Sequence, residues 1–288
     1  MKGDDCGRAL GAYRILFYAL LLVVSLARLG STCKVAEIPL ALWQPVGIFE
    51  VWHLVPLSAS SWNALVLLFL VTTVLSMLGL LSFLSMLLAG LSGFVTLNYS
   101  QCFGGGTHAV QIVAIMLLLW PWTGAGHFLS LDGLIWKRTH PDFQPQHYGQ
   151  GIWMGRFLLV MAFTLAGIAK LKLGGLEWLD GVSLQNYLIR VMTVADMSSN
   201  ELFGRPATLY LIRHVATLQA ASWSIVVLEI LAPLALWKPA KFRWIIVLLL
   251  GTQVGIYVTM GVNFAMYLSL YAFWIPERWL LKARQTSA

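Results

Sequence analysis

Long apolar stretches separated by short polar segments dominate the chain and predict membrane-spanning helices. A helix of about 20 apolar residues crosses the hydrocarbon core of a bilayer, and eight stretches have that character. The segments between them are rich in the proline, glycine and charged residues that are typical of loops. The predicted spans are residues 10–29, 62–80, 82–100, 108–127, 152–173, 215–237, 243–260 and 262–276.

The connections show where this bundle is expected to be irregular. Residues 31–60 contain three prolines and predict a loop, with a short helix at the membrane surface, and residues 79–82 predict a tight turn. Residues 174–213 form the longest polar connection, in which residues 183–193 alternate at helical spacing and predict a surface helix. Small residues let helices approach closely. The positions expected to do so are Gly90, Gly93, Gly155 and Gly167.

The composition narrows the function classes. Of the 288 residues, 59% are hydrophobic and only 11% are charged, whereas a soluble domain has about 25% charged residues. These values exclude a disordered chain, a small disulfide scaffold and almost any soluble enzyme. The net charge of +7 would suggest a nucleic-acid partner in a soluble protein. In a membrane protein, basic loops orient the helices, so we expect membrane lipid and no nucleic acid as a partner.

The distribution of basic residues predicts the orientation of the all-α polytopic bundle. With a cytoplasmic N-terminus, eleven lysines and arginines fall in inner loops and six in outer loops. This bias favours N-in and C-in, which requires an even number of spans. Cys33 and Cys102 then lie on the outer side, where they either pair or remain separate thiols, and Cys6 is cytoplasmic and free.

Two ionisable residues inside predicted spans are candidates for chemistry, because such groups are rare in membranes and usually functional. Lys170 lies near the outer end of the fifth span. It either extends to the membrane surface or, partly withdrawn from water, acts as a base. Gly167 leaves room for a neighbour or ligand on the same face. Glu229 is the only acid deep in a span and is either catalytic or structurally paired with Arg156 or Arg14.

His108 begins the fourth span, at the same predicted depth and on the same side as Lys170. It is either a proton shuttle or an ordinary residue at a helix end. Arg14 and Arg156 lie near cytoplasmic ends of spans, so we expect contact with water or lipid phosphate. His140, Asp142 and His147 share one loop, but their spacing matches no standard ligand pattern, and no metal site is predicted.

These residues belong to motifs that resemble a known family. The densest match is Ala166-Gly167-Ile168-Ala169-Lys170-Leu171 followed by Trp178-Leu179-Asp180-Gly181-Val182-Ser183-Leu184. The others are His108 leading to Ser130-Leu131-Asp132-Gly133-Leu134, the opening Tyr13-Arg14-Ile15-Leu16-Phe17, and Asn263-Phe264 to Ile275-Pro276. In this order they resemble the membrane domain of the vitamin K-dependent gamma-glutamyl carboxylases and their bacterial relatives, the horizontally transferred transmembrane domain (HTTM) family. The resemblance implies that residues 1–288 form one such domain, without a carboxylase-type soluble C-terminal domain.

The resemblance also implies roles. Lys170 would deprotonate a reduced quinone, menaquinol or a vitamin K-like molecule, whose oxidation drives base chemistry, and His108 would assist. Glu229 is a further catalytic candidate because of its place inside a span, not because of the resemblance. Thr107, Gly167, Trp178 and Asn263 would bind this cofactor, and the location would be a bacterial inner (plasma) membrane. Two departures stand out. Thr107 replaces an asparagine of the family, and Thr252 or Gln253 stands near the place of a family histidine.

Three functions follow as alternatives. The first is a quinol-dependent oxidoreductase or carboxylase-like lyase that uses Lys170 and His108 at an outward-facing cavity. The second is a peptide or toxin maturation factor that acts on a peptide substrate together with a soluble partner subunit. The third is a non-enzymatic bundle that binds quinone or lipid, or a transport component.

Overall fold

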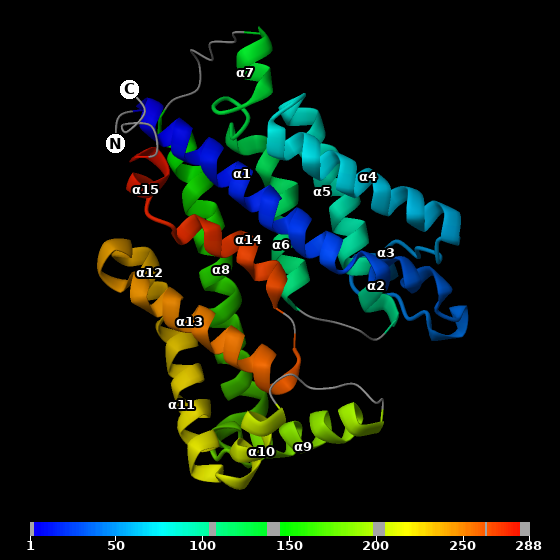
Figure 1. Ribbon diagram of the computed structural model, residues 1–288, viewed down its shortest axis with the longest axis vertical. Helices are drawn as coiled ribbons and strands as arrows, with labels where there is room; N and C mark the ends of the chain where they lie inside the picture. The colour runs from blue at the N-terminus through cyan, green and yellow to red at the C-terminus, as the bar shows by residue number, and fades with distance from the viewer. Residues whose placement is uncertain (1–2, 104–107, 137–144, 198–204, 263, 283–288) are drawn as a thin grey trace. The chain divides into compact units, whose positions relative to one another are not determined.

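The computed structural model describes residues 3–103, 108–136, 145–197, 205–262 and 264–282, and these contain helices and no strand (Figure 1). The predicted all-α polytopic bundle is therefore confirmed. The α-helices are α1 (Gly3–Ala27), α2 (Leu29–Lys34), α3 (Ile48–Val51), α4 (Ala59–Leu78), α5 (Ser82–Tyr99), α6 (His108–Leu119), α7 (Leu131–Trp136), α8 (Pro145–Gly174), α9 (Val182–Met197), α10 (Arg205–Arg213), α11 (Val215–Leu231), α12 (Pro233–Trp237), α13 (Pro239–Met260), α14 (Leu268–Tyr271) and α15 (Glu277–Lys282). Short 3-10 turns are η1 (Val35–Glu37), η2 (Leu40–Leu42), η3 (Ser100–Phe103), η4 (Trp120–Thr123), η5 (Gly175–Leu179), η6 (Ala265–Tyr267) and η7 (Ala272–Trp274).

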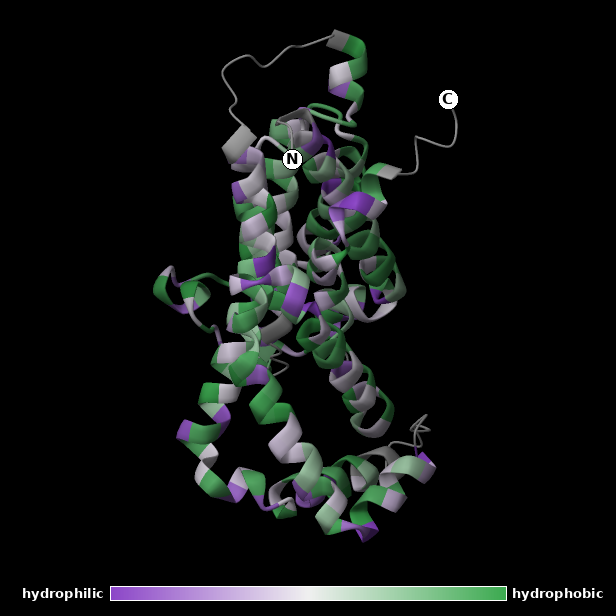
Figure 2. Ribbon diagram, turned by 90° about the vertical axis from the view of Figure 1, so that its left-hand side faces the viewer, coloured by the Kyte–Doolittle hydropathy of each residue, from purple (hydrophilic) through white to green (hydrophobic). Residues whose placement is uncertain are grey.

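Within the described residues, six helical stretches are long and apolar enough to cross a membrane. They lie at Asp5–Ala27, Ala59–Leu78, Ser82–Phe103, His147–Leu179, Val215–Trp237 and Pro239–Met260. The chain is thus an integral membrane protein. Many of its apolar side chains face outward: Trp223, Val227 and Ile230 on α11 and Trp244, Val247 and Leu248 on α13 are exposed. Figure 2 shows many apolar residues along the sides of the long helices that are in view, as expected of surfaces that face lipid.

The other two predicted spans coincide with shorter helical segments. The fourth is α6, which passes directly into the turn η4 at Pro121, a residue that has no N–H to continue an α-helix. The turn ends at Gly124 in a left-handed conformation. The eighth is the run η6, α14 and η7, which covers residues 265–274 before Pro276. At about 1.5 to 2 Å per residue this run is too short to cross a bilayer by itself.

The chain forms two compact units, which we describe separately. Unit 1 comprises the residues up to Leu158 together with those from Ala265, and unit 2 comprises Leu159–Phe264. Helix α8 begins in unit 1 and ends in unit 2. The division into two units describes packing and says nothing about family membership. The prediction that residues 1–288 form one domain of the HTTM type therefore stays a prediction.

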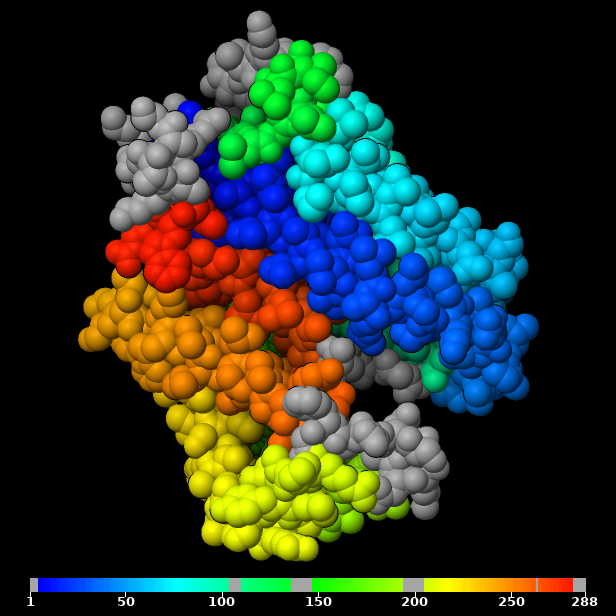
Figure 3. All heavy atoms as spheres, in the orientation of Figure 1, coloured from blue at the N-terminus to red at the C-terminus, as the bar shows by residue number. Residues whose placement is uncertain are grey.

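Unit 1 is built around α1, α4, α5 and α6, where α5 packs between α4 and α6. Helix α1 lies beside α4, as Figures 1 and 3 show. The core of unit 1 is aromatic. The ring centroids of Phe17 and Phe273 lie 5.6 and 5.4 Å from that of Trp120, and the ring of Tyr13 stacks on that of Phe273 at 5.3 Å. Offset and edge contacts of this kind add to the stability gained by burial.

The glycines expected at close helix contacts are all found there. A methyl group on Gly90 would lie 2.8 Å from the Leu117 carbonyl oxygen, so α5 and α6 approach backbone to backbone. Methyl groups on Gly93 and Gly155 would meet the rings of Phe69 and Phe273. Gly167 in unit 2 contacts α11 in the same way. The prediction based on these small residues is confirmed.

The tight turn predicted between the second and third spans is also present. Helix α4 ends at Gly79, whose φ of 68° lies in the left-handed region that favours glycine. The Leu80 amide donates to the Leu75 carbonyl at 3.0 Å and completes the helix end. Asp132 then accepts hydrogen bonds from the amides of Leu81 and Ser82 at 2.8 and 2.6 Å, which caps the start of α5.

Unit 2 contains the second half of α8 together with α9 to α13. Leu184, Leu188 and Leu218 form a small core where α9 meets α11, and Leu211, Ile212 and Met260 pack against it. Helix α9 contains residues 183–193, so the helix predicted in the long connection is confirmed.

Candidate functional site

Lys170 of α8 and Glu229 of α11 form an ion pair within unit 2. The Lys170 ammonium contacts both carboxylate oxygens of Glu229, with Nζ 2.6 Å from Oε2. The Lys170 side chain is 21% exposed, whereas that of Glu229 is 5% exposed. Lys170 is therefore the accessible member of the pair and Glu229 the buried one. The alternative pairing of Glu229 with Arg156 or Arg14 is wrong, because each arginine has other partners.

Gly167 makes this pairing possible. It lies one turn before Lys170 on α8, and a methyl group there would approach Glu229 Cβ to 3.0 Å and Ile230 Cγ1 to 3.2 Å. The absence of a side chain lets α11 pack closely against α8 at this level. A larger residue would push the two helices apart and lengthen the contact between ammonium and carboxylate.

Trp178 is the aromatic neighbour of the pair. Its ring centroid lies 5.7 Å from Lys170 Nζ, within the range of a cation–π contact. The turn η5 carries Trp178 back toward α8, where its indole packs against Gly174 so closely that any side chain at this position would collide with it. An ion pair is thus held beside an aromatic face.

The structure brings together four of the seven residues that the sequence indicates as a site. These are Lys170, Glu229, Gly167 and Trp178. Thr107 and Asn263 lie outside the described residues, as does the side chain of His108, whose backbone begins α6 in unit 1. The roles expected of these three residues stay predictions.

Arg14 is not at the membrane surface as the sequence suggested. It is completely buried in unit 1, and its Nη1 and Nη2 atoms donate to the carbonyl oxygens of Ala125 and Leu129 at 2.9 and 2.6 Å. Gly79 leaves the space for its guanidinium, because a methyl group there would lie 2.7 Å from Nη1. The loop that follows η4 thus supplies the acceptors that lipid or water was expected to provide.

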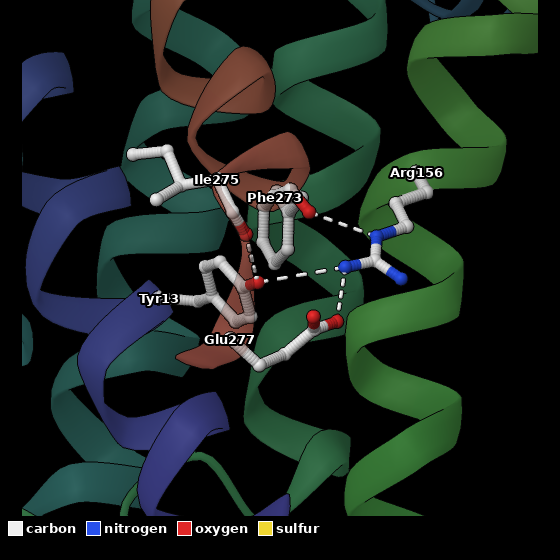
Figure 4. A network of polar contacts seen from close by, with 5 residues as sticks. All are labelled: Tyr13, Arg156, Phe273, Ile275 and Glu277. Carbon is white, nitrogen blue, oxygen red and sulfur yellow. Dashed lines mark hydrogen bonds and ion pairs between the residues drawn. The ribbon is translucent and has the colours of Figure 1, made fainter. Parts of the chain in front are cut away.

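Arg156 also has protein partners in place of lipid phosphate (Figure 4). Its Nε donates to the Phe273 carbonyl at 2.8 Å, and its Nη2 contacts the carboxylate of Glu277 and lies 3.5 Å from the Tyr13 hydroxyl. Tyr13 in turn donates to the Ile275 carbonyl at 2.6 Å. This network, together with the Arg14 contacts, joins three of the motifs on which the family resemblance rests. Sequence reasoning missed it because the partners are more than 100 residues apart.

No metal centre or disulfide is found among the residues described. No group of three histidine, cysteine, aspartate or glutamate side chains there is arranged to hold a metal, and His140 and Asp142 lie outside the described ranges. Cys6, Cys33 and Cys102 are free thiols.

Comparisons with protein-family models, with curated proteins and with solved structures find no match to this chain. The resemblance to the HTTM family therefore stays a prediction, and the Lys170–Glu229 site is the structural feature from which a function can be inferred.

Proposed function

We propose that this integral membrane protein is a quinol-dependent enzyme in which the Lys170–Glu229 pair accepts a proton from the substrate. The observation that carries the proposal is the asymmetric exposure of the pair: an accessible ammonium is held against a buried carboxylate. Ionisable groups at membrane depth are usually functional, and in unit 1 the charges of Arg14 and Arg156 are engaged by several protein groups each.

The pair can accept one proton as a unit. When a hydroxyl group contacts Lys170, Nζ can take its proton while passing one of its own protons to the Glu229 carboxylate. Lys170 then remains an ammonium group and Glu229 becomes a neutral acid. The positive charge that stays at Nζ stabilises the oxyanion left on the substrate, and such stabilisation is strong where water is excluded.

The surrounding residues fit a hydroxylated aromatic ring. A reduced quinone supplies a weakly acidic hydroxyl on such a ring. Trp178 offers an aromatic face within reach of Lys170, and Gly167 and Ile230 add no polar group that would compete for the hydroxyl. Menaquinol or a vitamin K-like quinol, a bacterial inner membrane and a final step on a peptide substrate are part of this proposal by resemblance.

Quinol turnover tests the proposal. Purified protein in lipid nanodiscs receives reduced menaquinone or vitamin K and oxygen, and the quinone epoxide is measured by mass spectrometry. We expect epoxide from the unaltered protein and a loss of roughly 100-fold or more in Lys170→Ala, the usual effect of removing a general base. Lys172→Ala is the matched control, since Lys172 lies two residues later on α8 and is exposed. It should retain full turnover.

A second variant separates chemistry from folding. Removing one member of a buried ion pair destabilises a protein, whereas replacing both with apolar residues is often neutral. The double variant Lys170→Met, Glu229→Leu should therefore fold and yet produce no epoxide. Full turnover in the double variant would show that the pair is structural. If the unaltered protein produces no epoxide from any quinol tried, the proposal of a quinol-dependent enzyme is wrong. A partner-dependent maturation factor or a non-enzymatic binding protein is then the function to test.

A further inference from the structure

A cavity of about 230 Å³ lies in unit 1, where α1 and α5 end and α4 begins. Its polar lining includes Arg28, Ser25 and Thr96, and its apolar lining includes Trp62, Val66 and Phe69. The Lys170–Glu229 pair belongs to unit 2, so this cavity is separate from the site proposed above.

Two hydroxyl groups in the cavity wall have no hydrogen-bond partner in the structure. Thr96 is 6% exposed, and its Oγ1 is buried without a partner. The Ser25 hydroxyl is also buried and unpartnered. Buried polar groups are nearly always hydrogen-bonded, and leaving one unmade is unfavourable. The two hydroxyls therefore keep donors that a ligand with hydrogen-bond acceptors would satisfy.

Arg28 adds a positive charge at the mouth of the cavity. It follows the last residue of α1 and is exposed, and it forms no ion pair within the described part of the chain. An arginine at the end of a spanning helix lies at the level of lipid head groups. Trp62, whose Nε1 donates to the Thr32 carbonyl at 2.9 Å, marks the same level.

We propose that this cavity binds an acidic phospholipid. Arg28 contacts the phosphate, the hydroxyls of Ser25 and Thr96 donate to the ester oxygens below it, and one acyl chain lies along Val66 and Phe69. This order of charge, hydroxyl donors and apolar wall matches the order of groups in a phospholipid. A cavity of this size is below the roughly 300 Å³ of a drug-sized ligand, so it holds the ester region and the start of one chain, and the rest of the lipid stays in the bilayer.

Lipid titration followed by native mass spectrometry tests this site. Delipidated full-length protein in detergent is titrated with phosphatidylglycerol, with phosphatidylcholine and with inorganic phosphate. We expect phosphatidylglycerol to bind most tightly. Arg28→Gln should weaken it roughly tenfold and Thr96→Val about threefold, as expected for the loss of a charged and a neutral hydrogen bond. Ser92→Ala is the matched control, because Ser92 lies one turn earlier on α5 and its buried hydroxyl already donates to Leu88.

The Thr96→Val variant also distinguishes binding from packing. Its hydroxyl has no protein partner, so its removal should leave the lipid-free protein at least as stable while lowering lipid affinity. Equal binding of both phospholipids, unchanged by Arg28→Gln and Thr96→Val, would overturn the proposal. Inorganic phosphate that binds as tightly as phosphatidylglycerol would also overturn it, in favour of a site for soluble anions. Neither result depends on quinol turnover.

Discussion

At the scale of single residues, the partner of each buried charge indicates its role. Arg14 is fully buried against two carbonyl groups, and the Arg156 side chain, 12% exposed, meets Glu277, Phe273 and Tyr13. Both guanidinium groups donate to protein acceptors, with only Arg14 Nε left buried and without a partner. Lys170 contacts a single carboxylate and keeps an exposed surface. A group that is both held in place and accessible is suited to proton transfer, whereas the two arginines are suited to joining helices.

The structural role of Arg14 can be tested by a conservative change. Lysine keeps the charge but lacks the forked guanidinium that reaches both Ala125 and Leu129, so Arg14→Lys leaves at least one of these two carbonyls without its charged donor. We expect a loss of roughly 2–4 kcal/mol in the free energy of unfolding. Arg8→Lys, at an exposed position six residues earlier on α1, should change it by less than about 0.5 kcal/mol. Unfolding in mixed detergent and SDS micelles measures both, and equal stability of the two variants would contradict a structural role.

At the scale of helices, the packing depends on where side chains are absent. The α5–α6 contact is made at Gly90, against the backbone of Leu117, and the α8–α11 contact at Gly167, against Glu229. The sequence indicates these positions because small residues stand out in apolar helices. It does not indicate that Pro121 shortens the fourth predicted span, because a proline near a helix end and one inside a kinked helix look alike in the sequence.

The Gly90 contact leads to a prediction at this scale. In Gly90→Ala the new methyl group would lie 2.8 Å from a backbone oxygen that cannot rotate away, so α5 and α6 must separate. The expected cost is roughly 1–3 kcal/mol, as for overpacking in a core. Gly251→Ala is the contrast: no atom lies within 4 Å of a methyl group there, and alanine favours a helix by up to about 1 kcal/mol over glycine. Stability measurements in which Gly90→Ala and Gly251→Ala are both less stable, or both more stable, than the unaltered protein would contradict the close contact at Gly90.

At the scale of the whole molecule, the sequence predicts the membrane helices well and the contacts between them poorly. Periodicity and apolar length locate the six long helices, because a bilayer demands both. The candidate pair is only half predicted: Lys170 and Glu229 stand out as charges in apolar spans, but the structural partners considered for Glu229 were Arg156 and Arg14, not Lys170. The Arg156–Glu277 network joins residues 121 positions apart, and no local pattern encodes such a distance.

The predicted orientation can be tested with the cysteines already present. Helix α1 places one bilayer crossing between Cys6 and Cys33, since the 21 residues from Gly7 to Ala27 extend about 32 Å. The first turns of α1 and helix α15 lie at the same end of unit 1 (Figure 1), as an even number of crossings requires. With the N-terminus in the cytoplasm, a membrane-impermeant maleimide added to intact cells should label Cys33 and leave Cys6 unlabelled.

Single-cysteine variants make this measurement specific. A protein that keeps only Cys6 should be labelled after the membrane is permeabilised, whereas one that keeps only Cys33 should be labelled before. Cys102 is buried and should react only after unfolding, which controls for loss of structure. Labelling of Cys6 in intact cells would invert the topology. It would also move Lys170 to the cytoplasmic side, so that a quinol enzyme built on this pair would act on cytoplasmic rather than exported substrates.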